Sequence, residues 1–434
     1  MIHLHTLPEA PDLLALYAHD RVSFPYLLQS AGDTGMDILF ALPAQQTIYH
    51  AGQAAQCAQD LASLPIDPAH TQDARFPFIG GWFFYLGYEM LHHFEPSVPP
   101  ALDDGFPLAV LARVPAAVVV ERATGQAYLM AETAALLAQL QAKIATATAL
   151  VSKPLAILAL EEDDPAVFTD AVKKIKHYIR EGDVFQVNVS REWRACLPAQ
   201  TQPADVFRAL RLANPAPFSA LADFGEQQIV SSSPERLVRV QDGWVDTRPI
   251  AGTHPRSTDP IEDAALKQRL IDNRKERAEH VMLIDLERND LGRICVPGTV
   301  EVNELMAVAS YTYVHHIESN VRGRPRAGIR PIDVFRALFP GGTITGCPKI
   351  RCMQIIRELE TSARRAYTGS LGYINRDGSL DSNILIRSFM MENDSLRFRA
   401  GAGIVADSDP DRELSETRHK ARGLLRALGI VDSL

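Results

Sequence analysis

The chain has 434 residues, of which 46% are hydrophobic and 22% are charged, so it is long enough to bury a large core or two lobes that share one. Its formal net charge of -9 argues against a nucleic-acid or anionic-membrane surface, and an anionic substrate would need a local cluster of cations. We find no apolar run of membrane-spanning length and no signal-peptide layout, so we expect a cytosolic protein. The five scattered cysteines suit a reducing cytoplasm better than a disulfide framework.

The first 160 residues predict a mixture of short strands and helices. Turn residues GDTG separate two apolar runs, and a Gly- and aromatic-rich run predicts a tightly packed strand. The expected elements are strands in 25–31, 36–43 and 76–90, a strand pair in 108–131, and a helix over 132–151. An acidic stretch with a proline follows, so we expect an N-terminal lobe of residues 1–160 and a second region of residues 161–434.

The pattern sharpens after this boundary. Residues 170–183 predict an amphipathic helix that ends at Gly182, and residues 184–195 alternate as a strand. One strand face carries Phe185, Val187 and Val189, which we assign to the core. Gln186 then lies on the opposite face, with Asn188 and Ser190, where it can line a substrate site.

Residues 213–256 predict a meander of strands. The turn SSSPER places Glu235 near the start of a strand, and Gly252 in PIAGT marks a bend or a close backbone approach. The strand 309–323 carries His315 and His316, whose side chains point to opposite faces, so at most one of them can face the site.

Two acidic helices form the centre of the prediction. Glu276 and Glu279 are three residues apart in the helix 272–293, and Glu413 and Glu416 have the same spacing far downstream. Such pairs are common on solvated helix faces, but carboxylate oxygens are also the ligands that Mg²⁺ prefers. We therefore expect the two helices to face each other and to hold one divalent cation.

Three glycine-rich or paired segments complete the catalytic region. They are a Gly-rich loop running into a helix over 339–359, a hairpin within 366–391 that turns at residues 375–378, and a strand over 398–408. The glycines of the last strand can offer backbone N–H groups to a carboxylate.

Taken together and in order, these strings resemble the chorismate-utilising enzymes. The matching strings are GDVFQVNVS, SPER, RPIAGTHPR, KERAEHVMLIDLERNDLGR, YVHHIES, FPGGTITGCPKIRCM, LDSNILIRS and AGAGIVADS…ELSETRHKA, which cover about residues 170–425. The resemblance implies an α+β fold of two intermixed lobes, in which antiparallel sheets pack as a sandwich with helices outside. The active site would lie between the sheets.

The resemblance also implies roles for individual residues. Glu279 and Glu416 match direct Mg²⁺ ligands, with Glu276 and Glu413 acting directly or through water. Glu235 matches a general acid for the leaving hydroxyl, and His316 matches a catalytic histidine. The residues that match substrate contacts are Arg387, Gly401, Gly403, Tyr367, Thr343, Lys420, Gly252 and Thr253.

Two positions bear on the reaction. Gln186 stands where the isochorismate and salicylate synthases have a water-activating lysine, and glutamine cannot act as a general base, so amination by ammonia is expected. Ala251 stands where aminodeoxychorismate synthases often have a nucleophilic lysine, and here the chain is like the anthranilate synthases.

Other local strings favour aminodeoxychorismate synthase component I of the folate pathway. They are LLQS, NPAPFSAL, FPGGTITGCPKIRCM and LDSNILIR. The alternatives are anthranilate synthase component I and, more distantly, a non-catalytic regulatory module. Such a module would hold an aromatic amino acid near Leu28–Ser30 and Asn214–Phe218. Cys347 in TGCPK lacks the second glycine of a GxCxG elbow, so we expect a separate glutamine amidotransferase subunit to supply ammonia.

Overall fold

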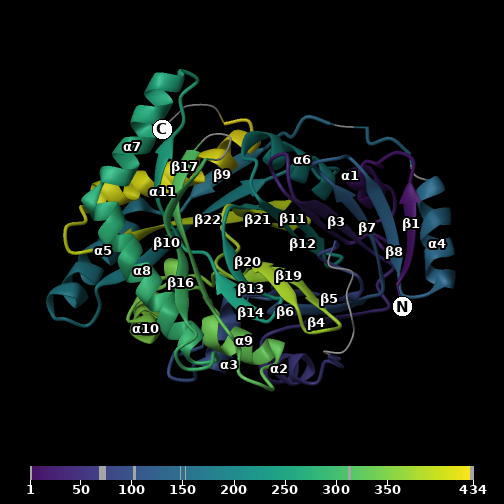
Figure 1. The fold of residues 1–434 in the computed structure, drawn as a ribbon. Coiled ribbons are helices and arrows are strands. Elements are labelled where there is room, and N and C mark those ends of the chain that lie inside the picture. Colours follow the sequence, from purple (N-terminus) through teal and green to yellow (C-terminus); the bar gives the residue numbers. More distant parts are fainter. Residues whose placement is uncertain are drawn as a thin grey trace.

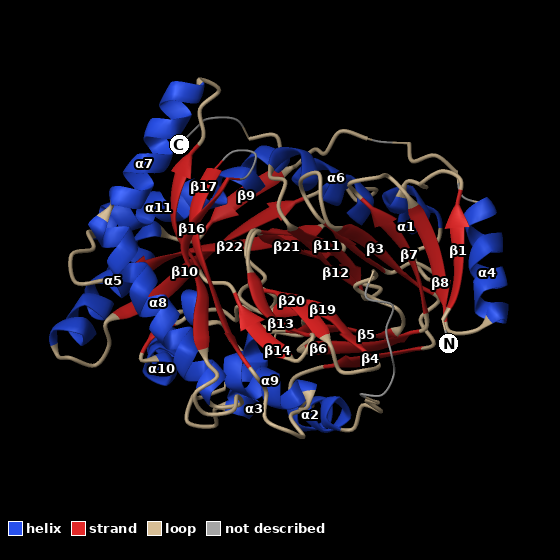
Figure 2. Ribbon diagram, viewed as in Figure 1, coloured by secondary structure: helices blue, strands red, loops and turns tan. Residues whose placement is uncertain are grey.

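The computed structural model describes residues 2–67, 75–100, 104–146, 148–151, 153–310 and 314–430. Within these ranges two antiparallel sheets form the centre of the molecule, and the helices lie outside them (Figures 1 and 2). Contacts between aromatic rings join the sheets face to face: Tyr26 on β2 stacks on Phe83 of β5 at 3.9 Å between ring centroids. The predicted α+β sandwich is therefore confirmed.

The larger sheet has twelve strands among the described residues, and neighbours pair antiparallel. Its path runs through β1 (His3–Leu7), β8 (Ala127–Ala131), β7 (Ala116–Glu121), β3 (Met36–Ala41), β2 (Tyr26–Gln29), β11 (Phe218–Asp223), β12 (Gln227–Ser233), β21 (Ser388–Glu392), β22 (Ser395–Ile404), β10 (Gln186–Cys196) and β18 (Gly346–Cys347), with β9 (Ala159–Glu162) also paired to β10.

The smaller sheet has ten strands in the same described ranges. Its path runs through β15 (Ile250–Pro255), β17 (Val314–Gly323), β14 (Trp244–Thr247), β13 (Arg236–Gln241), β20 (Leu380–Asn383), β19 (Ser370–Asn375), β5 (Gly81–Leu86), β6 (Ala109–Val114) and β4 (Gln45–Tyr49), with β16 (Glu301–Ser310) also paired to β17. Both sheets combine strands from before and after residue 160, for example β2 with β11 and β5 with β19. The lobes are therefore intermixed, and the boundary at residue 160 stays a prediction.

The helices cover the outer faces and one end of the sandwich (Figure 2). They are α1 (Leu13–His19), α2 (Ala54–Ala62), α3 (Leu91–Phe94), α4 (Ala134–Ala145), α5 (Pro165–Arg180), α6 (Pro203–Ala213), α7 (Pro260–Asp272), α8 (Arg274–Gly292), α9 (Pro331–Leu338), α10 (Lys349–Leu359) and α11 (Pro410–Ala427). The helix expected from residue 272 begins at Arg274, and α7 precedes it. None of the helices in the described part of the chain combines the length and apolar character that a membrane crossing requires.

Two of the places at which the chain changes sheets lie side by side. It leaves the larger sheet after β12 and enters the smaller one at β13, and it returns between β20 and β21. The two crossings are hydrogen-bonded: the Ile384 N–H donates to the Glu235 carbonyl at 3.0 Å, and the Ser232 N–H donates to the Arg387 carbonyl at 3.1 Å. Glu235 and Arg387 are thereby held between the sheets.

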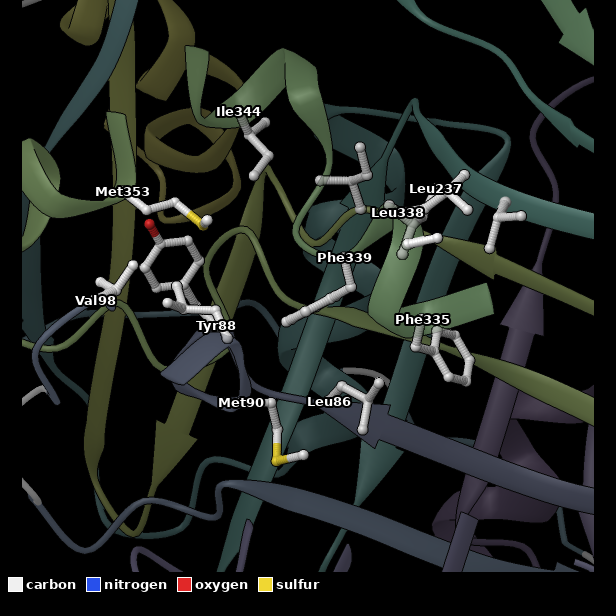
Figure 3. Close-up of a cluster of buried hydrophobic side chains, with 14 of the residues drawn as sticks. Leu86, Tyr88, Met90, Val98, Leu237, Phe335, Leu338, Phe339, Ile344 and Met353 are labelled. Carbon is white, nitrogen blue, oxygen red and sulfur yellow. The ribbon is translucent and has the colours of Figure 1, made fainter. Parts of the chain in front are cut away.

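A buried hydrophobic cluster supports these segments (Figure 3). Leu237 and Ile344 belong to it, and they lie next in sequence to the segments that carry Glu235 and Thr343. Phe335, Leu338 and Phe339 of α9 and its end fill the same cluster, and all five side chains are at most 4% exposed. Because cores are close-packed, the backbone around both polar residues is held in place.

One assignment to the core was wrong. Val187 and Val189 on β10 are buried as predicted, but Phe185 is 68% exposed. Phe185 precedes the strand, and its N–H donates to the Cys347 carbonyl at 2.8 Å, so the alternation of the strand does not extend to it. The other face is correctly predicted, because Gln186 points to the inside and is 3% exposed.

Candidate active site

Glu235 is a buried carboxylic acid between the two sheets. Its side chain is 5% exposed, and its Oε1 accepts no hydrogen bond from any residue that the structure describes. Burial raises its pKa from 4.5 to about 7, although Thr343 and the Ile250 backbone partly oppose the shift. A carboxyl group with this pKa is still about half protonated at pH 7, so it can serve as a general acid near neutral pH.

Arg387 presents an unbalanced positive charge near Glu235. Its backbone has a φ of 52° at the end of the second sheet crossing, and burial lowers the pKa of its guanidinium while the charge of Glu235 opposes this. Within the described ranges, no carboxylate forms an ion pair with it. A largely buried guanidinium without a carboxylate is strongly unfavourable unless an anion binds to it, so Arg387 fits a carboxylate-binding role.

His316 is oriented by the backbone of Gly252. The register of β15 against β17 shifts between Ala251 and Thr253, and Gly252 has a φ of 68°. His316 Nδ1 donates to the carbonyl oxygen of Gly252 at 3.2 Å. Burial and, to a smaller extent, Arg387 lower the pKa of His316 to about 4, so the imidazole is neutral. The side chain of Thr253 lies outside the described part of the chain.

The neighbouring His315 points away from the site. Its Nε2 lies 3.0 Å from Asp263 Oδ1 on α7, and its Nδ1 lies 2.8 Å from Ser310 Oγ. The prediction that only one of the two histidines faces the site is consistent with this arrangement, because the two make contacts on opposite sides of β17.

Helix α8 brings the first pair of glutamates to the sheets. Glu279 Oε1 accepts from Gln186 Nε2 at 3.0 Å, which joins α8 to β10. Glu276 packs against Gly252, since a Cβ at Gly252 would lie 3.1 Å from Glu276 Oε2. Gln186 and Glu279, which are 93 residues apart in sequence, are thus in contact.

The glycines of β22 leave room beside β10. A Cβ at Gly403 would lie 2.3 Å from Gln186 Nε2, and a Cβ at Gly401 would lie 2.8 Å from Asn188 Oδ1 and 2.9 Å from Tyr367 Oη. Burial raises the pKa of Tyr367 to about 12, so its hydroxyl keeps its proton. Only glycine fits at these two strand positions without moving the polar side chains.

The second pair of glutamates lies on α11, which packs on β22, α5 and α6. Glu413 Oε1 accepts from Ser408 Oγ at 2.6 Å, whereas Glu416 is half exposed and lies 3.8 Å from Lys420 Nζ. Among the residues that the structure describes, no three His, Cys, Asp or Glu side chains gather as a metal cluster.

The donor set nevertheless fits the predicted cation. Mg²⁺ typically takes one or two protein carboxylates and fills its remaining positions with waters and substrate oxygens. The carboxylates on α8 and α11 offer only oxygen donors, and Glu416 reaches its cationic neighbours no closer than 3.8 Å. The role of Glu279, Glu416, Glu276 and Glu413 as a shared site stays a prediction.

Arg364 is a positioning residue that the sequence reading missed. The buried guanidinium donates to Glu360 Oε1 at 2.7 Å, to the Asn188 carbonyl at 2.8 Å and to the Ile344 carbonyl at 3.2 Å. It therefore ties together the segments that carry Asn188, Thr343 and Tyr367. The spacing of Glu360 and Arg364 was the available signal, because they are four residues apart and of opposite charge, although Arg364 lies in the loop after α10.

The segments proposed for an aromatic amino acid are partly brought together. Leu28, Gln29 and Ser30 line a cavity of about 430 Å³ with Pro217 and Phe218. Asn214 is engaged elsewhere, because its Nδ2 donates to Ser232 Oγ at 2.6 Å.

Comparison with models of protein families matches residues 24–426 to the family described as chorismate binding enzyme. The chain belongs to this family. A solved member, anthranilate synthase component I from Streptococcus pneumoniae, is 31% identical with a TM-score of 0.81, over 91% of this chain and 93% of the solved one. The fold implied by the resemblance is therefore that of the family.

Curated relatives in the family carry two different names. Anthranilate synthase component 1 of Streptomyces coelicolor is 40% identical over 81% of this chain and 73% of its own length. Aminodeoxychorismate synthase component 1 of Bacillus subtilis is 48% identical over 61% of this chain and 56% of its own length. These likenesses establish that the chain belongs to the chorismate binding enzyme family, in which the relatives carry both names.

Proposed function

We propose that this chain is an aminodeoxychorismate synthase component I, which converts chorismate and ammonia into 4-amino-4-deoxychorismate without loss of pyruvate. The observation that carries amination is the buried Gln186 beside Glu279, because an amide cannot activate water as a general base.

Chorismate is a dianion, so two of its groups must be neutralised. Arg387 binds one carboxylate as a bidentate donor, and the backbone N–H groups of the Gly401–Gly403 segment add further donors. Tyr367 donates its hydroxyl proton beside them. Mg²⁺, held by Glu279 and Glu416 with Glu276 and Glu413 directly or through water, would neutralise and orient the other carboxylate. Thr343, Gly252, Thr253 and Lys420 complete the proposed contacts.

The chemical step replaces a carbon–oxygen bond by a carbon–nitrogen bond. Ammonia supplies the electron pair of the new bond, and the Glu235 carboxyl gives its proton to the departing hydroxyl, which leaves as water. The new ammonium group then releases a proton to the Glu235 carboxylate, which restores the acid. The neutral His316, oriented by Gly252, supplies a hydrogen-bonding imidazole beside Arg387.

The strings LLQS, NPAPFSAL, FPGGTITGCPKIRCM and LDSNILIR support amination at C4. The buried Ala251 favours the second candidate, anthranilate synthase component I, because no lysine amine is available there to attack the ring first. In that reaction ammonia adds at C2 of the ring instead of C4, the C4 hydroxyl leaves as water and pyruvate is eliminated.

Product identification tests the proposal. Purified protein is incubated with chorismate, Mg²⁺ and an ammonium salt, and the product is identified by mass and fluorescence. We expect 4-amino-4-deoxychorismate, and anthranilate formed without added lyase would establish the second candidate instead. A catalytically inert protein that still binds chorismate would indicate the regulatory module.

A separate glutamine amidotransferase subunit, acting in the cytoplasm, is proposed as the source of ammonia. The relatives named component I or 1 support a divided enzyme of this kind. Glutamine-dependent activity should therefore appear only when such a subunit is added, whereas ammonium-dependent activity should need this chain alone.

A further inference from the structure

Two side-chain amides on β10 have carbonyl oxygens without a hydrogen-bond donor among the described residues. Gln186 Oε1 and Asn188 Oδ1 are buried and accept no hydrogen bond from any described residue. Buried acceptors are nearly always satisfied in native proteins, so two of them on neighbouring residues of one strand face indicate a missing donor.

The hydrogen bonds donated by the two NH₂ groups fix the orientation of both amides. Gln186 Nε2 donates to Glu279 Oε1 at 3.0 Å, and Asn188 Nδ2 donates to the Thr343 carbonyl at 3.3 Å. A carboxylate and a carbonyl are acceptors only, so each must face the NH₂ end of the amide. Flipping either amide would place oxygen against oxygen, and the two carbonyl ends must therefore face the other way.

The space in front of Asn188 Oδ1 is kept open by glycine. Asn188 pairs with Gly403 and Ser190 pairs with Gly401, so the glycines share the face of β10 that carries both amides. A Cβ at Gly401 would lie 2.8 Å from Asn188 Oδ1. Residues two apart on a strand are about 7 Å apart, so both carbonyls can reach one small molecule between them.

The geometry points to an ammonia-binding subsite, formed by Gln186 Oε1 and Asn188 Oδ1, that receives the nucleophile of the reaction. Ammonia has three N–H donors and one lone pair. When acceptors hold its hydrogens, the lone pair is directed away from them, toward the ring carbon. Water is a poor fit because it would need a base, and neither amide is one.

This inference rests on the proposed function for the use of ammonia, and it assigns Asn188 a specific part in it. In this proposal Asn188 positions the nucleophile, and the binding of the chorismate carboxylates is left to Arg387, the Gly401–Gly403 backbone and the cation. Its loss should therefore change the response to ammonia and leave the response to chorismate unchanged.

The test is a titration with ammonium sulfate at saturating chorismate and Mg²⁺. The rate is measured as the consumption of chorismate, so the identity of the product does not matter. Asn188→Leu removes the acceptor at similar volume. We expect the KM for ammonia to rise about tenfold, as for one lost hydrogen bond, with the KM for chorismate within about twofold of wild type. Gln227→Leu, which removes an amide on β12 bonded to Glu392, is the matched control and should change neither.

Asn188→Ala supplies a second variant should Asn188→Leu fold poorly. It removes the same acceptor and adds no bulk beside Gly401, where a Cβ would lie 2.8 Å from Asn188 Oδ1. The KM for ammonia should again rise. An unchanged ammonia KM in a folded variant, or an equal rise in both KM values, would overturn the subsite. Wild-type protein that consumes no chorismate with ammonium would instead overturn the proposed function on which it rests.

Discussion

His316 Nδ1 donates to the carbonyl oxygen of Gly252 at 3.2 Å, so the tautomer of the buried imidazole is set by a backbone group in the left-handed region. This relationship depends on a bulge in β15, where the register against β17 shifts around Gly252. An unusual backbone conformation thus orients a site residue, as is common near functional sites.

Replacing Gly252 should disturb both stability and activity. In Gly252→Ala the Cβ would lie 2.8 Å from Leu270 and 3.1 Å from Glu276 Oε2, in addition to the strain of a φ of 68°. We expect the free energy of unfolding in urea to fall by about 2 kcal/mol or more and turnover to fall with it. Gly298→Ala is the control, because Gly298 has a φ of 81° but open space around it. Equal losses in the two variants would show that the contact with Glu276 is unimportant.

The pH dependence of stability should report the buried Glu235. Its folded-state pKa is raised from 4.5 to about 7, so the unfolded chain loses this proton first as the pH rises. The stability associated with the protonated carboxyl is therefore present below pH 4.5 and is lost as the pH rises to about 7. Glu235→Gln abolishes this loss, and above pH 7 it should be more stable than wild type by up to about 3 kcal/mol.

Urea unfolding at pH 5 and pH 8 measures this difference, with Glu181→Gln on the surface as a control that should show none. The same Glu235→Gln variant should lose turnover by a factor of about 10² to 10⁴, because an amide cannot supply the proton. Wild-type turnover should decline above about pH 7, as the acid loses its proton. A stability difference that does not grow with pH would contradict the raised pKa.

Two partly buried arginines should respond in opposite ways to replacement by methionine. Arg387 has no carboxylate partner among the described residues, so Arg387→Met should leave the free energy of unfolding unchanged or higher. Its affinity for chorismate, measured by calorimetry, should fall by about 100-fold or more through the loss of two charge-assisted hydrogen bonds. Unchanged affinity would exclude Arg387 as the carboxylate ligand.

Arg236 is the matched contrast, since it donates to both oxygens of Asp381 at 2.8 and 3.0 Å. Arg236→Met leaves Asp381 unpaired, and we expect a loss of about 3 kcal/mol in unfolding free energy. Chorismate affinity should be retained at a temperature at which this variant is folded.

Glu416 tests the proposed cation site with little risk to the fold. Its side chain is 47% exposed, so Glu416→Gln should keep the melting temperature of wild type. The Mg²⁺ concentration that gives half-maximal turnover should rise at least about tenfold when a direct ligand is lost. Asp411→Asn, in the first turn of the same helix, is the control and should leave the Mg²⁺ requirement unchanged. If Glu416→Gln behaves like the control, the proposed role of α11 in metal binding is wrong.

Periodicity and turn chemistry predicted most of the elements because these signals act over a few residues. The strands around 25–31 and 36–43, the meander after residue 213 and the hairpin turning at residues 375–378 all occur as expected. The choice of Gln186, Glu235, His316 and Arg387 depended on the resemblance of ordered strings, since each residue alone is ordinary.

The tertiary structure decided what surrounds these residues. Only the two adjacent sheet crossings bring Glu235 beside Arg387 and raise the pKa of its carboxyl, because burial depends on segments that are 150 residues apart. Arg364 likewise depends on the fold, because its partners Glu360, Asn188 and Ile344 come from separate segments. The exposure of Phe185, which the alternating pattern placed in the core, is also visible only in the folded chain. Local patterns determine which face a side chain takes, whereas desolvation and pairing of charges are set by contacts that only the folded chain makes.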